Sequence, residues 1–205
     1  IEPCDLGLDF HTSTRGRSNM LHARADMSEP PVARVANAFA SNVIIDSEGP
    51  SGSLRREASD AGTPMITIEL GEAHRFQRAL IDAALEGVLS VMAEFGMLET
   101  ETVKWPGWRT VIEGSDEKTW LRADAGGLVD MHHERGSLVE EGETVCTISN
   151  PFKTEVTEIE APFTGLLIGI PQNPLVYPGN PLCHLVSLEQ PTLRAFRQVR
   201  EQKGR

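Results

Sequence analysis

The sequence has 205 residues, and its 19 Lys and Arg against 30 Asp and Glu give a formal net charge of −11. That length suits one ordinary domain with a small second one, or two small domains, and a hydrophobic content of 40% is enough to build a core. The acidic balance argues against non-specific binding to nucleic acid or to an anionic membrane, because such binding needs a basic face.

The first half of the chain alternates strand and helix patterns. Apolar side chains at alternate positions predict a strand over residues 6–10, and the Arg- and Ser-rich stretch 12–28 predicts a polar loop. Further along we expect a helix after Pro30, a strand over 43–45, a short helix capped by Ser53, a strand over 65–70 and a long helix over 75–95. This order is typical of an α/β layer sheet.

From about Val103 the helical periodicity gives way to short strands separated by Gly and Pro. This half contains an internal repeat: the Gly127 segment matches the Gly165 segment at an offset of about 38, and Cys146 matches Cys183 at 37. Neither copy is large enough to bury its own apolar face, so the copies should pack together. We expect a small all-β barrel or sandwich domain with an internal pseudo-two-fold repeat over 103–190, after an α/β part over 1–102 and before a charged tail over 191–205.

The three cysteines do not form a disulfide framework, so a reducing compartment and a cytoplasmic location are expected. The longest strongly apolar stretch, residues 166–170, is far too short to cross a bilayer, and no membrane partner is expected. A homo-oligomer is an option that the sequence leaves open.

Candidate site residues gather at two predicted strand ends. Asp9 and His11 are two residues apart and would share one face of a strand, with the carboxylate able to hold the imidazole in one tautomer. Glu69 lies near the end of an apolar strand, and Gly71 leaves room for a ligand. The alternatives are a histidine that only lines a strand end and a glutamate that faces solvent.

A third group of candidates is basic. Arg15, Arg17 and Asn19 follow the first strand, and guanidinium and amide groups suit recognition of a carboxylate. The alternative for this group is a solvated surface loop. Arg55 and Arg56 add to a basic locus in an acidic chain, which could attract an anionic substrate.

The segment Leu8-Asp9-Phe10-His11-Thr12, followed by Arg17-x-Asn19, resembles the D-L-H-T…R-x-N segment of the succinylglutamate desuccinylase/aspartoacylase family. The strand that contains Glu69 and Gly71 is similar to the family's T-x-E-x-G strand, and Ser53-Leu54-Arg55 resembles its T-L-R. Residues 127–185 resemble the family's C-terminal β-domain.

The resemblance implies a zinc-carboxypeptidase-like mixed sheet with flanking helices, present in part, and a zinc-dependent amidohydrolase that deacylates a small anionic N-acyl amino acid. Carried over, His11 is a zinc ligand with Asp9 behind it, and Glu69 is the general base that then protonates the leaving amine. Arg55, with Arg17 and Asn19, would hold the substrate's carboxylate or the developing oxyanion, and Arg15 in the same basic stretch is a further substrate-binding candidate.

The chain departs from the family in one respect. The family's other two zinc ligands come from an H-x-x-E motif upstream, and no H-x-x-E occurs in this chain. One histidine cannot hold a catalytic Zn²⁺, which needs about three protein ligands. The chain is therefore expected to be the C-terminal portion of a longer enzyme. The runner-up is a non-catalytic carboxylate-binding module or a truncated remnant.

A third hypothesis is a biotinyl- or lipoyl-like carrier domain, in which Lys153 would be modified. Its flanking residues do not match either carrier type, so a solvated lysine on a hairpin is the better interpretation. His132 and His133 are expected on a surface loop, because adjacent strand residues point to opposite faces. Tyr177 is left without a role.

Overall fold

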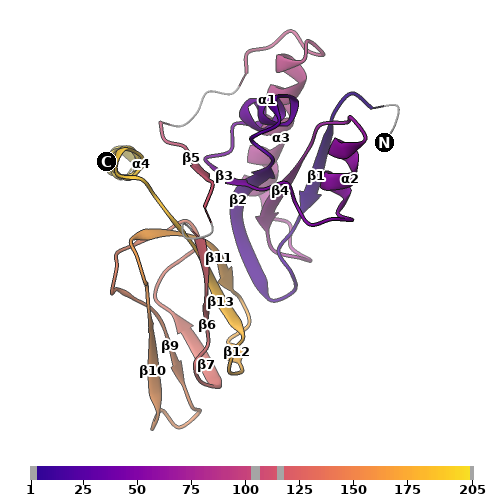
Figure 1. Cartoon of the computed structure of the whole chain (residues 1–205). Coiled ribbons are helices and arrows are strands. Elements are labelled where there is room, and N and C mark those ends of the chain that lie inside the picture. Colours follow the sequence, from indigo (N-terminus) through magenta and orange to yellow (C-terminus); the bar gives the residue numbers. More distant parts are fainter. Residues whose placement is uncertain (1–3, 103–106, 115–117, 204–205) are drawn as a thin grey trace.

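The computed structural model describes residues 4–102, 107–114 and 118–203. Its main feature is a nine-stranded mixed sheet, and a second sheet of four strands packs beside part of it (Figure 1). The large sheet contains β1 (Gly7–His11), β2 (Arg17–Ala25), β3 (Val43–Asp46), β4 (Met65–Gly71), β5 (Thr110–Ile112), β6 (Lys118–Arg122), β8 (Leu138–Val139), β11 (Gly165–Pro171) and β13 (Pro181–Ser187). The second contains β7 (Gly127–Met131), β9 (Thr144–Ser149), β10 (Val156–Glu160) and β12 (Leu175–Val176).

Four helices occur in the described part of the chain, namely α1 (Pro30–Phe39), α2 (Leu54–Asp60), α3 (Arg78–Glu94) and α4 (Gln190–Lys203). α1 begins with two prolines, whose fixed φ suits a first helical turn, and Ser53 caps α2 by accepting a hydrogen bond from the Arg56 amide. The predicted long helix is confirmed, although it begins at Arg78 instead of Arg75. No described helix combines the length and the apolar character that a membrane span requires.

α1 and α3 cover one face of the β1–β4–β2–β3 part of the sheet. Alternate strand residues such as Ile66, Ile68 and Ala23 pack there against Val35 and Phe39 of α1. Gly87 of α3 lies so close to the Phe39 ring that any side chain at this position would collide with it. The opposite face of the same strands carries polar side chains, among them His11, Glu69 and His22, and we call it the polar face.

The prediction of a polar loop over 12–28 is wrong, because β2 occupies residues 17–25 of that stretch. β2 is a central strand that pairs with β4 on one side and with β3 and β11 on the other. Its pairing with β4 shifts between Asn19 and His22, so the alternation of side chains is broken there. That break, together with the polar residues on one face, hides the strand from pattern analysis.

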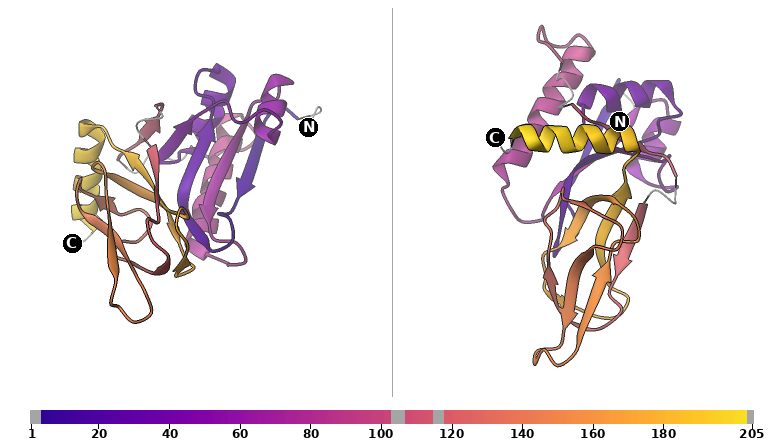
Figure 2. Two further views of the ribbon diagram at one scale, coloured as in Figure 1. Left: turned by 60° about the horizontal axis from the view of Figure 1, so that its bottom comes forward. Right: turned by 90° about the vertical axis from the view of Figure 1, so that its left-hand side faces the viewer.

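The large sheet continues from the α/β part into the β part through the antiparallel pairing of β2 with β11. The large sheet therefore contains strands from both sides of the predicted boundary at residue 102. The four-stranded sheet packs on β11 and β13 through buried residues such as Val145, Ile148, Leu167 and Leu185. In the predicted tail, α4 crosses the molecule near the junction of the two parts (Figure 2), and Leu193 and Phe196 are buried there.

In each copy of the predicted repeat, a short two-residue strand pairs with a strand of the other copy. β8 pairs with β11, and β12 pairs with β7. The cysteines at corresponding positions, Cys146 and Cys183, are both buried and free, and burial raises the pKa of their thiols to about 11 and about 12. The pseudo-two-fold symmetry of a separate β-domain stays a prediction.

Candidate functional site

His11 and Glu69 lie side by side on the polar face of the large sheet. β1 and β4 run parallel, and His11 pairs with Glu69 in their register, so both side chains emerge on the same face. Asp9 lies on this face too, and its Oδ2 is 3.0 Å from His11 Nε2. The structure therefore brings together three residues that the sequence predicted for the site.

Two donors from β2 hold the carboxylate of Glu69. Asn19 Nδ2 donates to Oε2 over 3.2 Å, and Arg24 Nε donates to Oε1 over 3.3 Å. The Glu69 side chain is only 15% exposed, so its charge depends on these contacts for compensation. One guanidinium and one amide donor thus fix the orientation of this carboxylate.

A row of register partners crosses the sheet next to Glu69. It runs from Gly71 on β4 through Asn19 on β2, Gly169 on β11 and His184 on β13 to Trp120 on β6. A Cβ atom at Gly169 would lie 3.0 Å from Asn19 Oδ1 and 3.3 Å from His184 Cβ, so glycine permits this close approach. His184 stacks on Trp120 with ring centroids 4.5 Å apart. The β part thus extends the polar face that carries Glu69.

Two buried histidines belong to this face. His22 pairs with Glu69 in the register of β2 and β4, and its Nδ1 lies 2.9 Å from the Met20 carbonyl oxygen. Its Nε2 is buried and has no hydrogen-bond partner among the described residues. Burial and the nearby Arg24 lower the pKa of His22 to about 3 and that of His184 to about 4. Both imidazoles are therefore neutral near pH 7.

The predicted arginines are separated by the structure. Arg17 lies on β2 with its guanidinium 4.8 Å from the Trp120 ring centroid, and Arg15 is exposed in the turn before β2. Arg55 is buried on α2 and donates to the Ser47 carbonyl oxygen just after β3. Ser47 bonds to Ala25, the last residue of β2, whereas Glu69 pairs with His22, three residues before that end. No hydrogen bond or ion pair joins Arg55 to Glu69, whereas Arg24 bonds to Glu69 and its charge also acts on Arg55.

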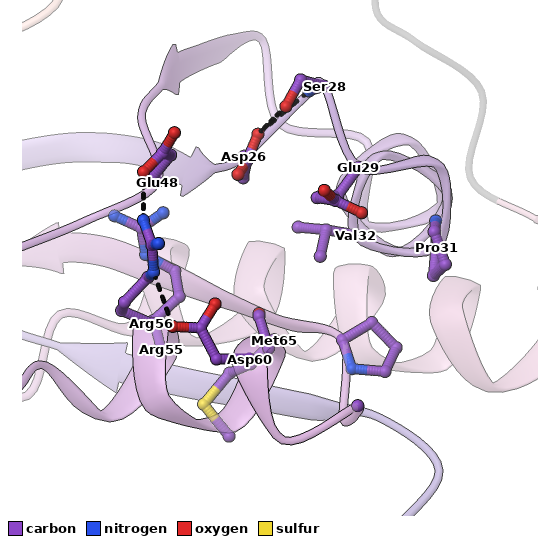
Figure 3. A pocket seen from close by; sticks show the side chains of 13 residues that line it. Asp26, Ser28, Glu29, Pro31, Val32, Glu48, Arg55, Arg56, Asp60 and Met65 are labelled. Carbon is purple, nitrogen blue, oxygen red and sulfur yellow. Dashed lines mark hydrogen bonds and ion pairs between the residues drawn. The ribbon is translucent and has the colours of Figure 1, made fainter. Parts of the chain in front are cut away.

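Arg55 and Arg56 line a cavity of about 420 Å³ between α2, α1 and the end of β2 (Figure 3). Arg56 forms ion pairs there with Glu48 and Asp60, which raise the pKa of its guanidinium. Burial is the main cause that lowers the pKa of Arg55, with the like charge of Arg24 second. The chain's own carboxylates already neutralise much of this cavity's positive charge.

The sequence model of the succinylglutamate desuccinylase/aspartoacylase catalytic domain matches residues 1–95. That range contains Asp9, His11, Asn19, Arg24 and Glu69, the residues that converge on the polar face. This match supports the family resemblance that the sequence motifs indicate. No curated protein matches the chain at a significant level.

Several solved structures share the fold, and two of the three described next carry this family's name. The ectoine utilization protein EutE (DoeB) from Ruegeria pomeroyi is 19% identical with a TM-score of 0.79, over 91% of this chain and 62% of that one. A succinylglutamate desuccinylase from Silicibacter sp. TM1040 is 22% identical with a TM-score of 0.78, over 92% and 60%. A succinylglutamate desuccinylase/aspartoacylase from Rhodobacter sphaeroides is 20% identical with a TM-score of 0.77, over 93% and 60%. The chain spans about three fifths of the length of these structures.

The zinc ion that the family resemblance implies needs about three protein ligands. His11 Nε2 faces the Asp9 carboxylate, and Glu69 is occupied by Asn19 and Arg24. No group of three or more His, Cys, Asp or Glu side chains that could hold a metal occurs in residues 4–102, 107–114 and 118–203. The described residues alone therefore do not fit a catalytic zinc site.

The remaining candidates lie apart from Glu69. His132 Nε2 lies 3.4 Å from Thr147 Oγ1, and His133 Nε2 lies 3.3 Å from Glu143 Oε1, so the two imidazoles have different partners. Lys153 is exposed in the turn between β9 and β10, and Tyr177 is exposed after β12. None of these positions adds to the polar face.

Sequence analysis missed Arg24, His22, His184 and Trp120. Arg24 and His22 follow Asn19 on β2, and a strand prediction there would have placed them beside it. His184 and Trp120 are more than sixty residues apart and meet only because β13 pairs with β6. No local pattern in the sequence indicates the contact between His184 and Trp120.

Proposed function

We propose that the chain carries the general base and part of the substrate site of a deacylase. The reaction is hydrolysis of the amide bond in a small N-acyl amino acid or a similar anionic molecule. The match of residues 1–95 to the family's catalytic domain supports hydrolase chemistry, and two similar solved structures are named succinylglutamate desuccinylase and succinylglutamate desuccinylase/aspartoacylase. The observation that carries the proposal is the Glu69 carboxylate, held by Asn19 and Arg24 on the same face as His11.

Glu69 acts as the proton carrier of this reaction. One of its carboxylate oxygens accepts a proton from the attacking water, whose oxygen forms the new bond to the acyl carbon. The carbon–nitrogen bond then breaks, and Glu69 delivers the proton to the leaving amine nitrogen. Asn19 and Arg24 keep the carboxylate oriented through both transfers, while Arg17 is the guanidinium on this face that supplies charge for an anionic substrate.

Dependence on one Zn²⁺ per active site is a further part of the proposal, with His11 as one ligand and Asp9 supporting it. The family resemblance supports it, and the additional ligands would have to come from outside the described residues. When bound, such an ion supplies a Lewis acid. The substrate roles of Arg15 and Arg55, a cytoplasmic location and a homo-oligomer stay predictions.

Replacement of Glu69 by Gln in the enzyme that contains this chain tests the proposal. The change keeps the size of the side chain and removes the proton acceptor, so we expect kcat to fall by about 10²–10⁴ with N-acyl amino acids as substrates. Glu94→Gln is the matched control, since Glu94 lies at the end of α3, where it pairs with Arg34. Turnover by Glu69→Gln at the rate of the Glu94→Gln control would refute the role of Glu69.

A further inference from the structure

A cavity of about 240 Å³ lies where the turn before β2 meets the loop between β11 and β13. Its polar lining comes from Arg15, Arg17, Asn173 and Asn180, and the rest is glycine, proline and aliphatic residues. No described Asp or Glu lines it. We call it the Arg15–Asn180 pocket. In a chain with a net charge of −11, a cavity with two guanidinium groups and no carboxylate is a specific feature.

The two asparagines present donors in this pocket. Asn173 Oδ1 accepts a hydrogen bond from the Leu175 amide over 3.1 Å, and Asn180 Oδ1 accepts one from the Tyr177 amide over 3.0 Å. A backbone N–H can only donate, so both side-chain oxygens are fixed as acceptors in these turns. Each Nδ2 group therefore remains as a donor, with no partner in the described part of the chain. The polar lining is thus rich in donors, which suits an anion.

Arg17 is held in place without a carboxylate. Its guanidinium lies over Trp120, which stacks on His184, and its Nη1 donates to the Leu182 carbonyl oxygen over 3.4 Å. Burial is the main cause that lowers its pKa, and the like charge of Arg122 acts in the same direction. Within the described residues no Asp or Glu forms an ion pair with it. A partly buried charge is costly without a counter-ion, and an anion beside Arg17 would offset that cost.

The pocket is within reach of Glu69 along β2. Arg17 and Asn19 are two residues apart on the same strand, so their side chains emerge on the same face at a spacing of about 7 Å. Asn19 donates directly to Glu69. A small molecule could therefore place one group at Glu69 and a second group near Arg17.

We propose that the Arg15–Asn180 pocket binds a small oxyanion, namely the carboxylate of the substrate that lies farthest from the scissile amide. The identity of that ligand rests on the proposed function, whereas the binding of an anion does not. Two guanidinium forks and two amide donors match the oxygens of a carboxylate. Asn173 and Asn180 thereby give the β part a direct share in substrate selection.

Binding can be measured without turnover. Sodium acetate is titrated into the chain at constant ionic strength set with chloride, and NMR follows Arg17 Nε–H and the Nδ2 groups of Asn173 and Asn180. We expect saturable shifts at these groups. A parallel titration with inorganic phosphate tests the other common oxyanion. The absence of saturation with acetate, or tighter binding of phosphate, would overturn the carboxylate assignment.

Asn180→Asp is the decisive variant. The new side chain still has an oxygen that can accept from the Tyr177 amide, so the turn is retained, but a charged acceptor replaces the donor. We expect acetate to bind at least about tenfold more weakly, because one hydrogen bond to a charged group is lost and repulsion is added. The matched control is Asn150→Asp, in the turn between β9 and β10, where Oδ1 accepts from the Thr154 amide. Unchanged affinity in Asn180→Asp would refute the pocket.

Positioning of Arg17 by Trp120 has its own readout. Trp120→Phe keeps an aromatic face under the guanidinium, whereas Trp120→Ala removes it. We expect Phe to retain most of the acetate affinity and Ala to lose it, with the thermal midpoint recorded for both. Equal affinities in the two variants would exclude the positioning role. Acetate binding without deacylation in the full enzyme would support the pocket and refute the proposed function. Deacylation without acetate binding would refute the pocket and support the proposed function.

Discussion

The α/β part and the β part of the molecule share one sheet but place polar groups on it differently. In the α/β part, Asn19 and Arg24 both donate hydrogen bonds to Glu69 on the face of a central sheet. In the β part, residues such as Leu167 and Ile148 fill the space between two sheets, and the two asparagine donors of the Arg15–Asn180 pocket lie in turns. A polar network on a central sheet face costs desolvation, so its presence indicates chemistry there.

The largest expected effect tests whether the two parts unfold together. Leu167 is fully buried between the two sheets, so Leu167→Ala should lower the free energy of unfolding by about 2–5 kcal/mol. The pairing of β2 with β11 joins the parts, and we expect a single urea transition in both tryptophan fluorescence and far-UV circular dichroism. Leu175→Ala, at a half-exposed site, should change stability by about 0.5 kcal/mol or less.

Two separate unfolding transitions for the wild-type chain would show that the two parts do not unfold together. The β part would then be an independent unit, and the polar face would depend on the α/β part alone.

An effect of intermediate size concerns the neutral histidines of the polar face. Their pKa values in the folded state, about 3 for His22 and about 4 for His184, lie below the ordinary value of 6.5. The unfolded chain therefore binds more protons between these values, so the stability contribution is complete above about pH 6.5 and is lost as the pH falls. Each histidine should contribute up to about 1.4 kcal/mol per pH unit.

Urea unfolding at pH 7.5 and pH 5.0 measures this dependence. His184→Phe keeps an aromatic ring against Trp120 and removes one titrating group, so its loss between the two pH values should be about 2 kcal/mol smaller than that of the wild type. His74→Asn serves as control, because His74 is exposed and its positive φ of 61° suits asparagine. An equal pH dependence in His184→Phe and wild type would show that His184 is not held neutral.

The elements with a clear apolar pattern could be predicted from the sequence. The strand that contains Glu69 and the helix α3 have such patterns, and both lie where they were expected. β2 could not be predicted, because its register shift and its polar residues on one face remove the alternation that marks a strand. The strand that was missed is therefore the one that supplies Asn19 and Arg24 to the site.

The site residues divide in the same way. The proximity of His11 and Glu69 follows from two strand ends that were predicted from local pattern, with the family resemblance linking them. Trp120, His184 and Gly169 contribute through strand pairings between distant segments, which no local pattern specifies. The placement of Arg55 at the level of the end of β2 likewise depends on how α2 packs after β3.

The smallest expected effect comes from the helical side of the α/β part, which carries no polar network on its sheet face. Arg34 on α1 pairs with Glu94 on α3 over 2.9 Å, and its guanidinium lies 4.5 Å from the Phe95 ring centroid. Both charged side chains are substantially exposed, so Arg34→Met should lower the free energy of unfolding by about 0.2–1 kcal/mol, and high salt should reduce the difference. Urea unfolding at low and high NaCl concentration measures it. If Arg34→Met lowered the free energy of unfolding as much as Leu167→Ala, exposed contacts would contribute as much stability as buried ones in this molecule. The burial of polar groups on the sheet face would then no longer distinguish them from ordinary surface charges.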